Sequence, residues 1–209
     1  METLHPTEVR VLGCLLEKDL TTPEYYPLTL NALVNACNQK SSRNPVVHYE
    51  ESTVMQALAL LREKNLVTRL SGAGHRVEKY GHRLGDLLNL GRRELALLCV
   101  LMLRGPQTVG ELRGRTERMH SFSDLAEVEH VLESLAAAEP DPLVAPMARG
   151  RWAQLWSGMP DDDAVEAAPA ASSHAAQVTR SALEARVEKL EEELAELRAR
   201  LDRFEEQFQ

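Results

Sequence analysis

The chain has few aromatic residues and no long hydrophobic run. Phe, Trp and Tyr together make up 4% of its 209 residues, although 44% are hydrophobic, so the core must consist mainly of Leu, Val and Ala. No run approaches the roughly 18 apolar residues that a membrane-spanning helix needs. No basic, apolar leader follows Met1. We therefore expect a cytoplasmic protein that is neither secreted nor inserted in a membrane.

Cysteine is also scarce. Cys14, Cys37 and Cys99 are far apart in the sequence, and each lies in a Leu- and Ala-rich helical pattern. They lack the paired spacing of zinc ligands, and no group of histidines shows such spacing either. We expect the three thiols to be small buried side chains in a reducing compartment, with no metal site.

The sequence contains no recognisable catalytic constellation. We find no nucleophile beside a base, no paired carboxylates for acid–base chemistry and no phosphate-binding loop. The glycines of 71–75 (SGAGH) lack the strand-to-helix setting of such a loop, and a hairpin turn explains them better. The sequence therefore predicts a protein that is not an enzyme and has no cofactor.

Acidic charge is concentrated at one end of the chain. The formal net charge is −8. Residues 1–90 carry ten basic and ten acidic side chains, residues 91–158 carry eight and nine, and residues 159–209 carry six and thirteen. The acidity belongs to the tail, so it does not exclude nucleic-acid binding by the front, but no part of the chain is strongly basic.

The stretch 28–67 has the pattern of a helix, a polar connection, a second amphipathic helix and the start of a strand. Thr29 is placed to cap the first of these helices. The second should run from about Glu50 to Asn65, and at 100° per residue its apolar and polar positions separate into two faces. The inward face holds Val54, Ala57, Leu58 and Leu61, and the outward face holds Ser52, Gln56, Ala59 and Glu63. Strands at 66–70 and 75–80 would then form a hairpin, the wing of a winged helix.

A fainter copy of this order follows, with shorter connections. Thr108 and Glu111 form a capping box there. The fold class is therefore mainly α with small β wings, as two tandem winged helix-turn-helix domains plus a C-terminal coiled-coil helix. The expected boundaries are winged-helix domains at 1–88 and 89–158, a flexible linker at 159–179 and the coiled-coil helix at 180–209.

Three segments resemble the bacterial YceH family. They are EVRVLGCLLEK at 8–18, TTPEYYPLTLNAL at 21–33 and ACNQKSSRNPV at 36–46. The resemblance covers roughly residues 2–158 and implies a tandem winged-helix fold in a cytoplasmic bacterial protein. It implies no reaction, cofactor or partner, because the family is functionally uncharacterised.

Candidate nucleic-acid contacts lie in the first copy. Side chains on an inserted helix can read bases, whereas cations of a connection or wing neutralise phosphates. Glu50 and Glu51 oppose base reading, because they stand at the helix end that normally enters the groove. In the second copy, no Lys or Arg occurs from Phe122 to Pro146. The candidates are Lys40, Arg43, Ser52, Gln56, Arg69, Arg76 and Lys79.

Two functions remain open at this point. The first is a non-enzymatic tandem winged-helix protein that binds double-stranded DNA through domain 1, in a role like that of a transcription regulator. The alternative is a protein–protein interaction or assembly module that uses winged helices without DNA contact. Fold analogy favours the first, and the acidic second copy favours the alternative.

The tail has a heptad seam that predicts a parallel homodimeric coiled coil. Apolar residues alternate at spacings of four and three, and pairs such as Arg186 with Glu191 would attract across a parallel dimer. The alternative is a single helix that folds back onto the domains. The candidate dimerisation residues are Leu183, Val187, Leu190, Leu194, Leu197, Leu201 and Phe204.

Dimerisation through the tail can be tested by sedimentation of the full chain and of residues 1–158. The seam spans about 39 Å of helix, so we expect a dimer of micromolar or weaker affinity in the full chain only. A full chain that stays monomeric at high concentration would rule the dimer out.

Overall fold

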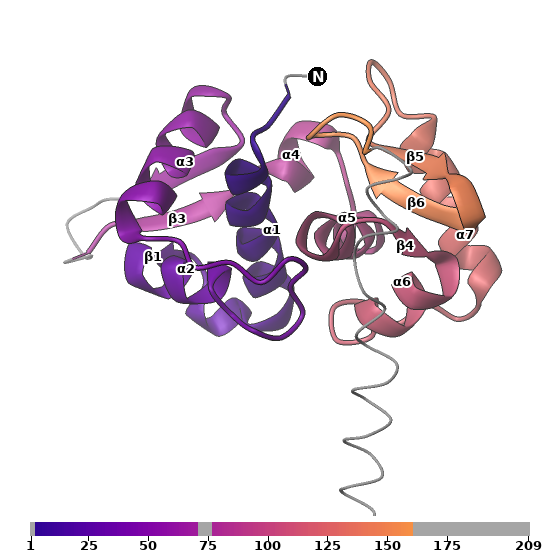
Figure 1. Cartoon of the computed structure of the whole chain (residues 1–209), viewed down its shortest axis with the longest axis horizontal. Coiled ribbons are helices and arrows are strands. Elements are labelled where there is room, and N and C mark those ends of the chain that lie inside the picture. The colour runs from indigo at the N-terminus through magenta and orange to yellow at the C-terminus, as the bar shows by residue number, and fades with distance from the viewer. Residues whose placement is uncertain (1–2, 71–76, 161–209) are drawn as a thin grey trace, which may run out of the picture. The chain divides into compact units, whose positions relative to one another are not determined.

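The computed structural model describes residues 3–70 and 77–160, all of which fall within one compact unit. Helices alternate with two small sheets (Figure 1). The helices are α1 (Pro6–Thr21), α2 (Leu30–Cys37), α3 (Glu51–Glu63), α4 (Leu84–Leu88), α5 (Arg92–Arg104), α6 (Val109–Thr116) and α7 (Leu125–Ala136), with short 3₁₀ turns at Pro23–Tyr25 and Ala148–Gly150. The strands are β1 (Leu28–Thr29), β2 (Val67–Leu70), β3 (Lys79–His82), β4 (Gln107–Thr108), β5 (Val144–Met147) and β6 (Arg151–Gln154).

The N-terminal half places α1, α2 and α3 beside a three-stranded antiparallel sheet of order β1-β3-β2. Thr29 caps α2 as predicted, since its hydroxyl accepts a hydrogen bond from the Ala32 amide. Strands β2 and β3 pair antiparallel, as the predicted hairpin requires, but β3 extends to His82 instead of ending at Tyr80. Residues 75–76 of the predicted return strand lie outside the described residues. At the end of this strand, the Tyr26 hydroxyl accepts a 2.6 Å hydrogen bond from the His82 amide.

The C-terminal half repeats the order of elements. Helices α5, α6 and α7 accompany a second antiparallel sheet of order β4-β6-β5, which matches the order of the first sheet. The predicted capping box is confirmed, because Thr108 and Glu111 exchange their side-chain and backbone hydrogen bonds at the start of α6. The described chain is therefore a mixed fold of helices with small antiparallel sheets, consistent with winged helices.

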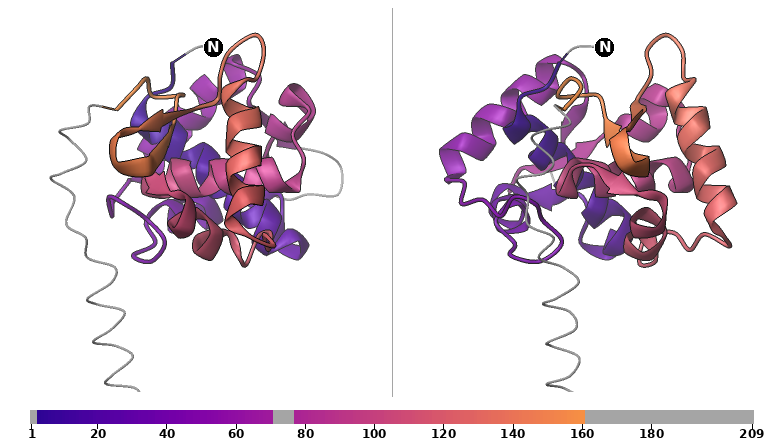
Figure 2. Two further views of the ribbon diagram at one scale, coloured as in Figure 1. Left: turned by 90° about the vertical axis from the view of Figure 1, so that its right-hand side faces the viewer. Right: turned by 45° about the vertical axis from the view of Figure 1, so that its right-hand side comes forward.

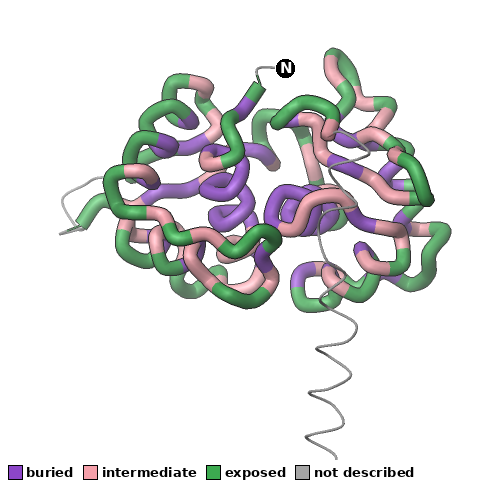
Figure 3. The backbone as a smooth tube through the Cα atoms, viewed as in Figure 1, coloured by how far each residue is buried: buried purple, intermediate pink, exposed green. Residues whose placement is uncertain are grey.

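The two halves meet where α1 packs against α5, the most extensive contact between elements (Figures 1 and 2). An ordinary surface helix buries one stripe, yet both of these helices are buried nearly all round, since each has its own half on one side and the other helix opposite. Figure 3 shows this as two central buried coils. Cys14 and Cys99 lie in these helices and Cys37 ends α2, and all three thiols are buried as predicted.

A glycine permits the close approach of α1 to α5. A Cβ atom at Gly13 would lie 3.0 Å from a side-chain carbon of Leu103, which is tighter than ordinary van der Waals contact. The Cys99 thiol donates a hydrogen bond to the carbonyl of Gly13 at 3.6 Å. Arg92 adds a second link, because its guanidinium donates to the carbonyls of Leu20 in the first half and Met119 in the second.

Candidate functional site

Helix α3 presents the outward face that its periodicity predicts. Its apolar positions are buried in the core, and the opposite positions Ser52, Gln56, Ala59 and Glu63 are exposed. Two apolar side chains flank this face, Met55 with 51% of its surface exposed and Leu60 with 38%. The face therefore combines polar groups that could reach a nucleic acid with apolar groups that suit a protein surface.

The end of α3 and strand β2 enclose an open groove of about 590 Å³. Three arginines line it: Arg62 from the last turn of α3, Arg69 from β2, and Arg83 just after β3. Glu63 contributes one carboxylate. Among the described residues, no hydrogen bond or ion pair occupies the guanidinium groups of Arg62 and Arg83. The groove is therefore cationic, in contrast to the acidic N-terminus of α3, where Glu50 and Glu51 are exposed.

The arginine on β2 is already engaged at the surface. Arg69 forms a 2.8 Å ion pair with Glu78, and both side chains are more than 40% exposed. Such exposed pairs typically contribute less than about 1 kcal/mol, so Arg69 can exchange Glu78 for an external anion at little cost. Tyr80, which lies opposite Arg69 in the sheet, donates its hydroxyl to the same carboxylate at 3.1 Å.

The structure brings together only some of the predicted contact residues. Ser52 and Gln56 lie on α3, and Arg69 joins the end of that helix in the groove. Lys79 is half-buried in β3, the middle strand of its sheet, and Lys40 is exposed in the connection between α2 and α3. Arg76 lies outside the described residues, as does the whole tail seam from Leu183 to Phe204.

Arg62 and Arg83 line the groove but are not among the contacts predicted from the sequence. Arg62 shares the flank of α3 with Met55, two turns further along the helix and away from the centre of the outward face. Arg83 reaches the groove because its backbone amide donates to the carbonyl of Leu66 at 2.9 Å, which extends the hairpin beyond β3. A basic residue in the last turn of the third helix was the one available signal, and it also fits simple pairing with the helix dipole.

The prediction that Arg43 is an exposed contact is wrong. Its side chain is fully buried, and its guanidinium forms a two-pronged ion pair with the carboxylate of Glu17 on α1, with N–O distances of 2.9 and 2.6 Å. The remaining donors bond the carbonyls of Ala36 and Ser42 and the side chain of Gln39. Arg43 therefore serves the fold, because a buried charge is tolerated only when it is paired and hydrogen-bonded.

Other polar contacts secure the same long connection. Asn38 and Tyr49, near its two ends, exchange hydrogen bonds of 2.9 and 2.7 Å between the Asn38 amide group and the Tyr49 backbone. The buried Arg10 donates to the carbonyls of Cys37 and Pro45. The Asn44 amide donates to the carbonyl of Leu103 on α5 at 2.9 Å. This segment is thus a structural joint between the halves.

Burial and the ion pair act on Glu17 in opposite directions. Burial alone would raise the pKa of Glu17, but the hydrogen bonds and positive charge of Arg43 outweigh it and hold that pKa below its ordinary value. The carboxylate of Glu17 in turn raises the pKa of Arg43, despite the opposing effect of burial. Both groups are therefore charged at neutral pH.

The corresponding helix of the C-terminal half has a different surface. The exposed positions of α7 include Glu129, His130 and Glu133, without any basic residue of the kind that lines the first groove. Within residues 3–70 and 77–160, no group of His, Cys, Asp or Glu could hold a metal ion. In that part of the chain, no helix combines the length and hydrophobicity needed to cross a membrane.

Comparison with known proteins places the chain among close relatives. A family described as "Protein of unknown function, DUF480" matches residues 4–151. A UPF0502 protein of Citrifermentans bemidjiense is 60% identical over 164 residues, which cover 76% of each chain. One from Geotalea uraniireducens is 52% identical over 99% of this chain and 98% of its own.

The resemblance to YceH proteins is confirmed. The UPF0502 protein YceH of Salmonella paratyphi B is 46% identical over 211 residues, which cover 95% of this chain and 94% of its own. The similarity extends beyond residue 158, the end of the resemblance found from the sequence motifs.

Replacing Arg43 with Ala should lower the free energy of unfolding by about 3 kcal/mol, because the largely buried Glu17 carboxylate would lose both hydrogen bonds to Arg43 and keep only its contact with Lys18. Lys40→Ala is the matched control in the same connection, and its exposed side chain should change that free energy by less than about 0.5 kcal/mol. Urea unfolding measures both. Equal stability of the two variants would contradict the structural role of Arg43.

The Glu17 ion pair should also make stability depend on pH. Because the folded-state pKa of Glu17 lies below the unfolded value of about 4.3, its contribution is complete above that value and declines as the pH falls through the folded-state pKa. The difference in unfolding free energy between the natural chain and Glu17→Gln should therefore be constant near neutral pH and shrink below about pH 4. A constant difference from pH 7 to pH 3 would be incompatible with this.

Proposed function

The chain belongs to the DUF480 family, and we propose that it is a non-enzymatic tandem winged-helix protein that holds duplex DNA by its phosphate backbone through the N-terminal half. The observation that carries the proposal is the groove of Arg62, Arg69 and Arg83 between α3 and the hairpin. Cations in such a position neutralise phosphates and release condensed counterions, which supplies most of the affinity for DNA.

The arrangement of charge favours backbone contact over base reading. The N-terminal end of a recognition helix normally reaches the bases, but Glu50 and Glu51 stand at that end of α3 and would repel phosphates. The arginines lie at the opposite end of the helix and on the sheet. We therefore infer binding that depends weakly on DNA sequence and strongly on salt.

Dimerisation of the tail would strengthen such binding. A homodimer formed through the heptad seam would carry two cationic grooves, so that one duplex could be held at two points. The second contact would then occur at a raised effective concentration. This part of the proposal depends on the sedimentation result, whereas binding by a single groove does not.

The second candidate function is a protein interface on α3. It is favoured by the exposed Met55 and Leu60 on that helix and by Leu70 and Val77, which are 42% and 58% exposed at the hairpin. Methionine is common on surfaces that bind helical or extended partners. Under this alternative, Met55→Glu would abolish partner binding while DNA would not bind the natural chain.

DNA binding can be measured by fluorescence anisotropy with a varied pool of duplexes over a range of salt concentrations. The logarithm of the binding constant should fall with the logarithm of salt concentration, with a slope of about −2.7 for three phosphate contacts per groove. Arg62→Gln should weaken binding equally for all sequences and reduce that slope by about 1.

Arg93→Gln is the matched control, since Arg93 is an exposed arginine at the start of α5, away from the groove. It removes the same charge and should leave both affinity and slope unchanged. Absence of binding by the natural chain to any duplex at low salt would reject the proposal. An equal effect of the two variants would also reject the groove as the contact.

A further inference from the structure

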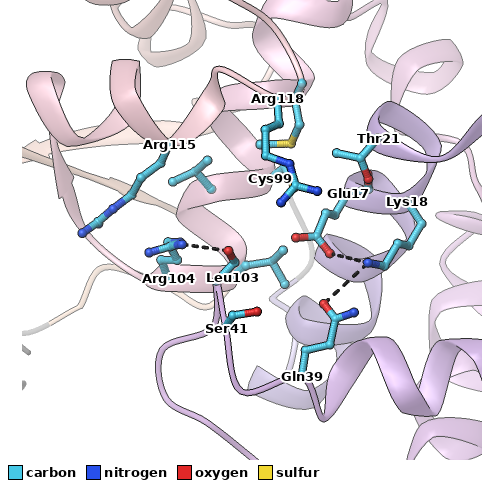
Figure 4. A pocket seen from close by; sticks show the side chains of 13 residues that line it. Glu17, Lys18, Thr21, Gln39, Ser41, Cys99, Leu103, Arg104, Arg115 and Arg118 are labelled. Atoms are coloured by element: carbon cyan, nitrogen blue, oxygen red, sulfur yellow. Dashed lines mark hydrogen bonds and ion pairs between the residues drawn. The ribbon is translucent and has the colours of Figure 1, made fainter. Parts of the chain in front are cut away.

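A second group of cationic side chains lies apart from the α3 groove. It is a cavity of about 290 Å³ bounded by α1, the connection between α2 and α3, α5, and α6 with the turn that follows it. Its floor includes apolar side chains of α5, namely Cys99, Val100 and Leu103. Figure 4 shows charged side chains around the opening, with Glu17 and Lys18 on one side, Arg104 and Arg115 on the other, and Arg118 between them.

The lining has more positive than negative charge. Four cations line the cavity, Lys18, Arg104, Arg115 and Arg118, together with one carboxylate, that of Glu17. This excess is notable in a chain whose formal net charge is −8. Close like charges are unfavourable, so a structure that gathers them gains stability from any bound anion.

Existing partners neutralise only part of this excess. Arg115 forms a 3.2 Å ion pair with Glu111, so the remaining excess rests on the other cations. Both oxygens of the Glu17 carboxylate accept hydrogen bonds from the guanidinium of Arg43. Glu17 is therefore shared between Arg43 and Lys18, whose ammonium lies 3.3 Å from one of the same oxygens. Arg104 donates to the neutral hydroxyl of Ser42 at 2.9 Å. Within residues 3–70 and 77–160, no carboxylate forms an ion pair with Arg104 or Arg118. Burial lowers the pKa of Arg104, and the nearby charges of Arg115 and Arg43 lower it further.

We propose that this cavity binds a small molecule through a phosphate group. An arginine guanidinium can donate two parallel hydrogen bonds to the oxygens of one phosphate group. A phosphate with a charge near −2 can also neutralise more than one cation, whereas a single carboxylate would leave most of the excess positive charge uncompensated. Ser41, Thr21 and Gln39 add neutral polar groups at the rim. The volume is close to the lower end of small-molecule sites, about 300 Å³, and suits a compact ligand.

The position of the cavity gives the ligand a structural consequence. Lys18 belongs to the N-terminal half and Arg104, Arg115 and Arg118 to the C-terminal half, so a phosphate held between them would link the halves beside the α1–α5 contact. A ligand that binds the folded state alone stabilises it by RT ln(1 + [L]/Kd), so the unfolding temperature rises with ligand concentration. The inference is independent of DNA binding, because the α3 groove uses different arginines.

The test is thermal unfolding and calorimetric titration of the full chain with inorganic phosphate, pyrophosphate and ribose 5-phosphate. Sodium chloride and citrate at matched ionic strength are the controls for general salt effects and for carboxylates. At least one phosphate compound should raise the unfolding temperature above both controls. Tighter binding of ribose 5-phosphate than of the inorganic ions would identify an ester as the ligand type.

Arg118→Gln is the informative variant, because its exposed side chain makes no ion pair in the described part of the chain and its loss should leave the fold intact. It should raise the dissociation constant for the best probe about tenfold or more, as expected for the loss of one charge-assisted hydrogen bond. Arg104→Gln should do the same, and Arg62→Gln on α3 should have no effect. The proposal is overturned if the phosphates act no differently from chloride or citrate, or if Arg62→Gln weakens binding as much as Arg118→Gln.

Discussion

The buried ion pair between Glu17 and Arg43 is the interaction on which the rest of the arrangement depends. A guanidinium removed from water must have nearly all of its donors satisfied, and Arg43 achieves this with both oxygens of Glu17 and with acceptors at Ala36, Gln39 and Ser42. These partners lie on α1, at the end of α2 and within the connection itself. The pair therefore fixes the position of a segment that has no regular secondary structure between α2 and α3.

Once fixed, this connection determines the two features to which we assign function. Its Asn38–Tyr49 clamp closes the loop immediately before α3, which sets where that helix and its outward face begin. On its other side, Asn44 bonds the carbonyl of Leu103 and Ser42 accepts from Arg104, so the same segment forms one wall of the cavity between the halves. The length of the connection, which exceeds the usual three or four residues of a helix-turn-helix, thus has a structural explanation.

Features that depend on local sequence could be predicted, and those that depend on distant partners could not. The two faces of α3 follow from helical periodicity, and the caps at Thr29 and Thr108 follow from residue type and spacing.

Arg43 was misassigned because its partner is 26 residues earlier and its neighbours in the sequence are polar. The groove was found only in part, since Arg62 and Arg83 are brought together by packing. The α1–α5 contact had a visible signal, the continuous apolar run from Leu95 to Leu103, which predicts a helix buried all round but does not identify the helix that packs against it.

The acidic character of the chain does not oppose the cationic groove, because the two act over different distances. At physiological salt, charges more than about 8 Å apart are largely screened, so a phosphate in the groove responds to Arg62, Arg69 and Arg83 rather than to the sum over the chain. The excess of acidic residues lies in 159–209, whereas 1–90 are balanced. Net acidity instead affects the rate of association with DNA. Because the chain as a whole does not attract a polyanion at long range, that rate should be low compared with that of a basic protein. A chain with this distribution of charge suits contacts that form locally and release readily as salt rises.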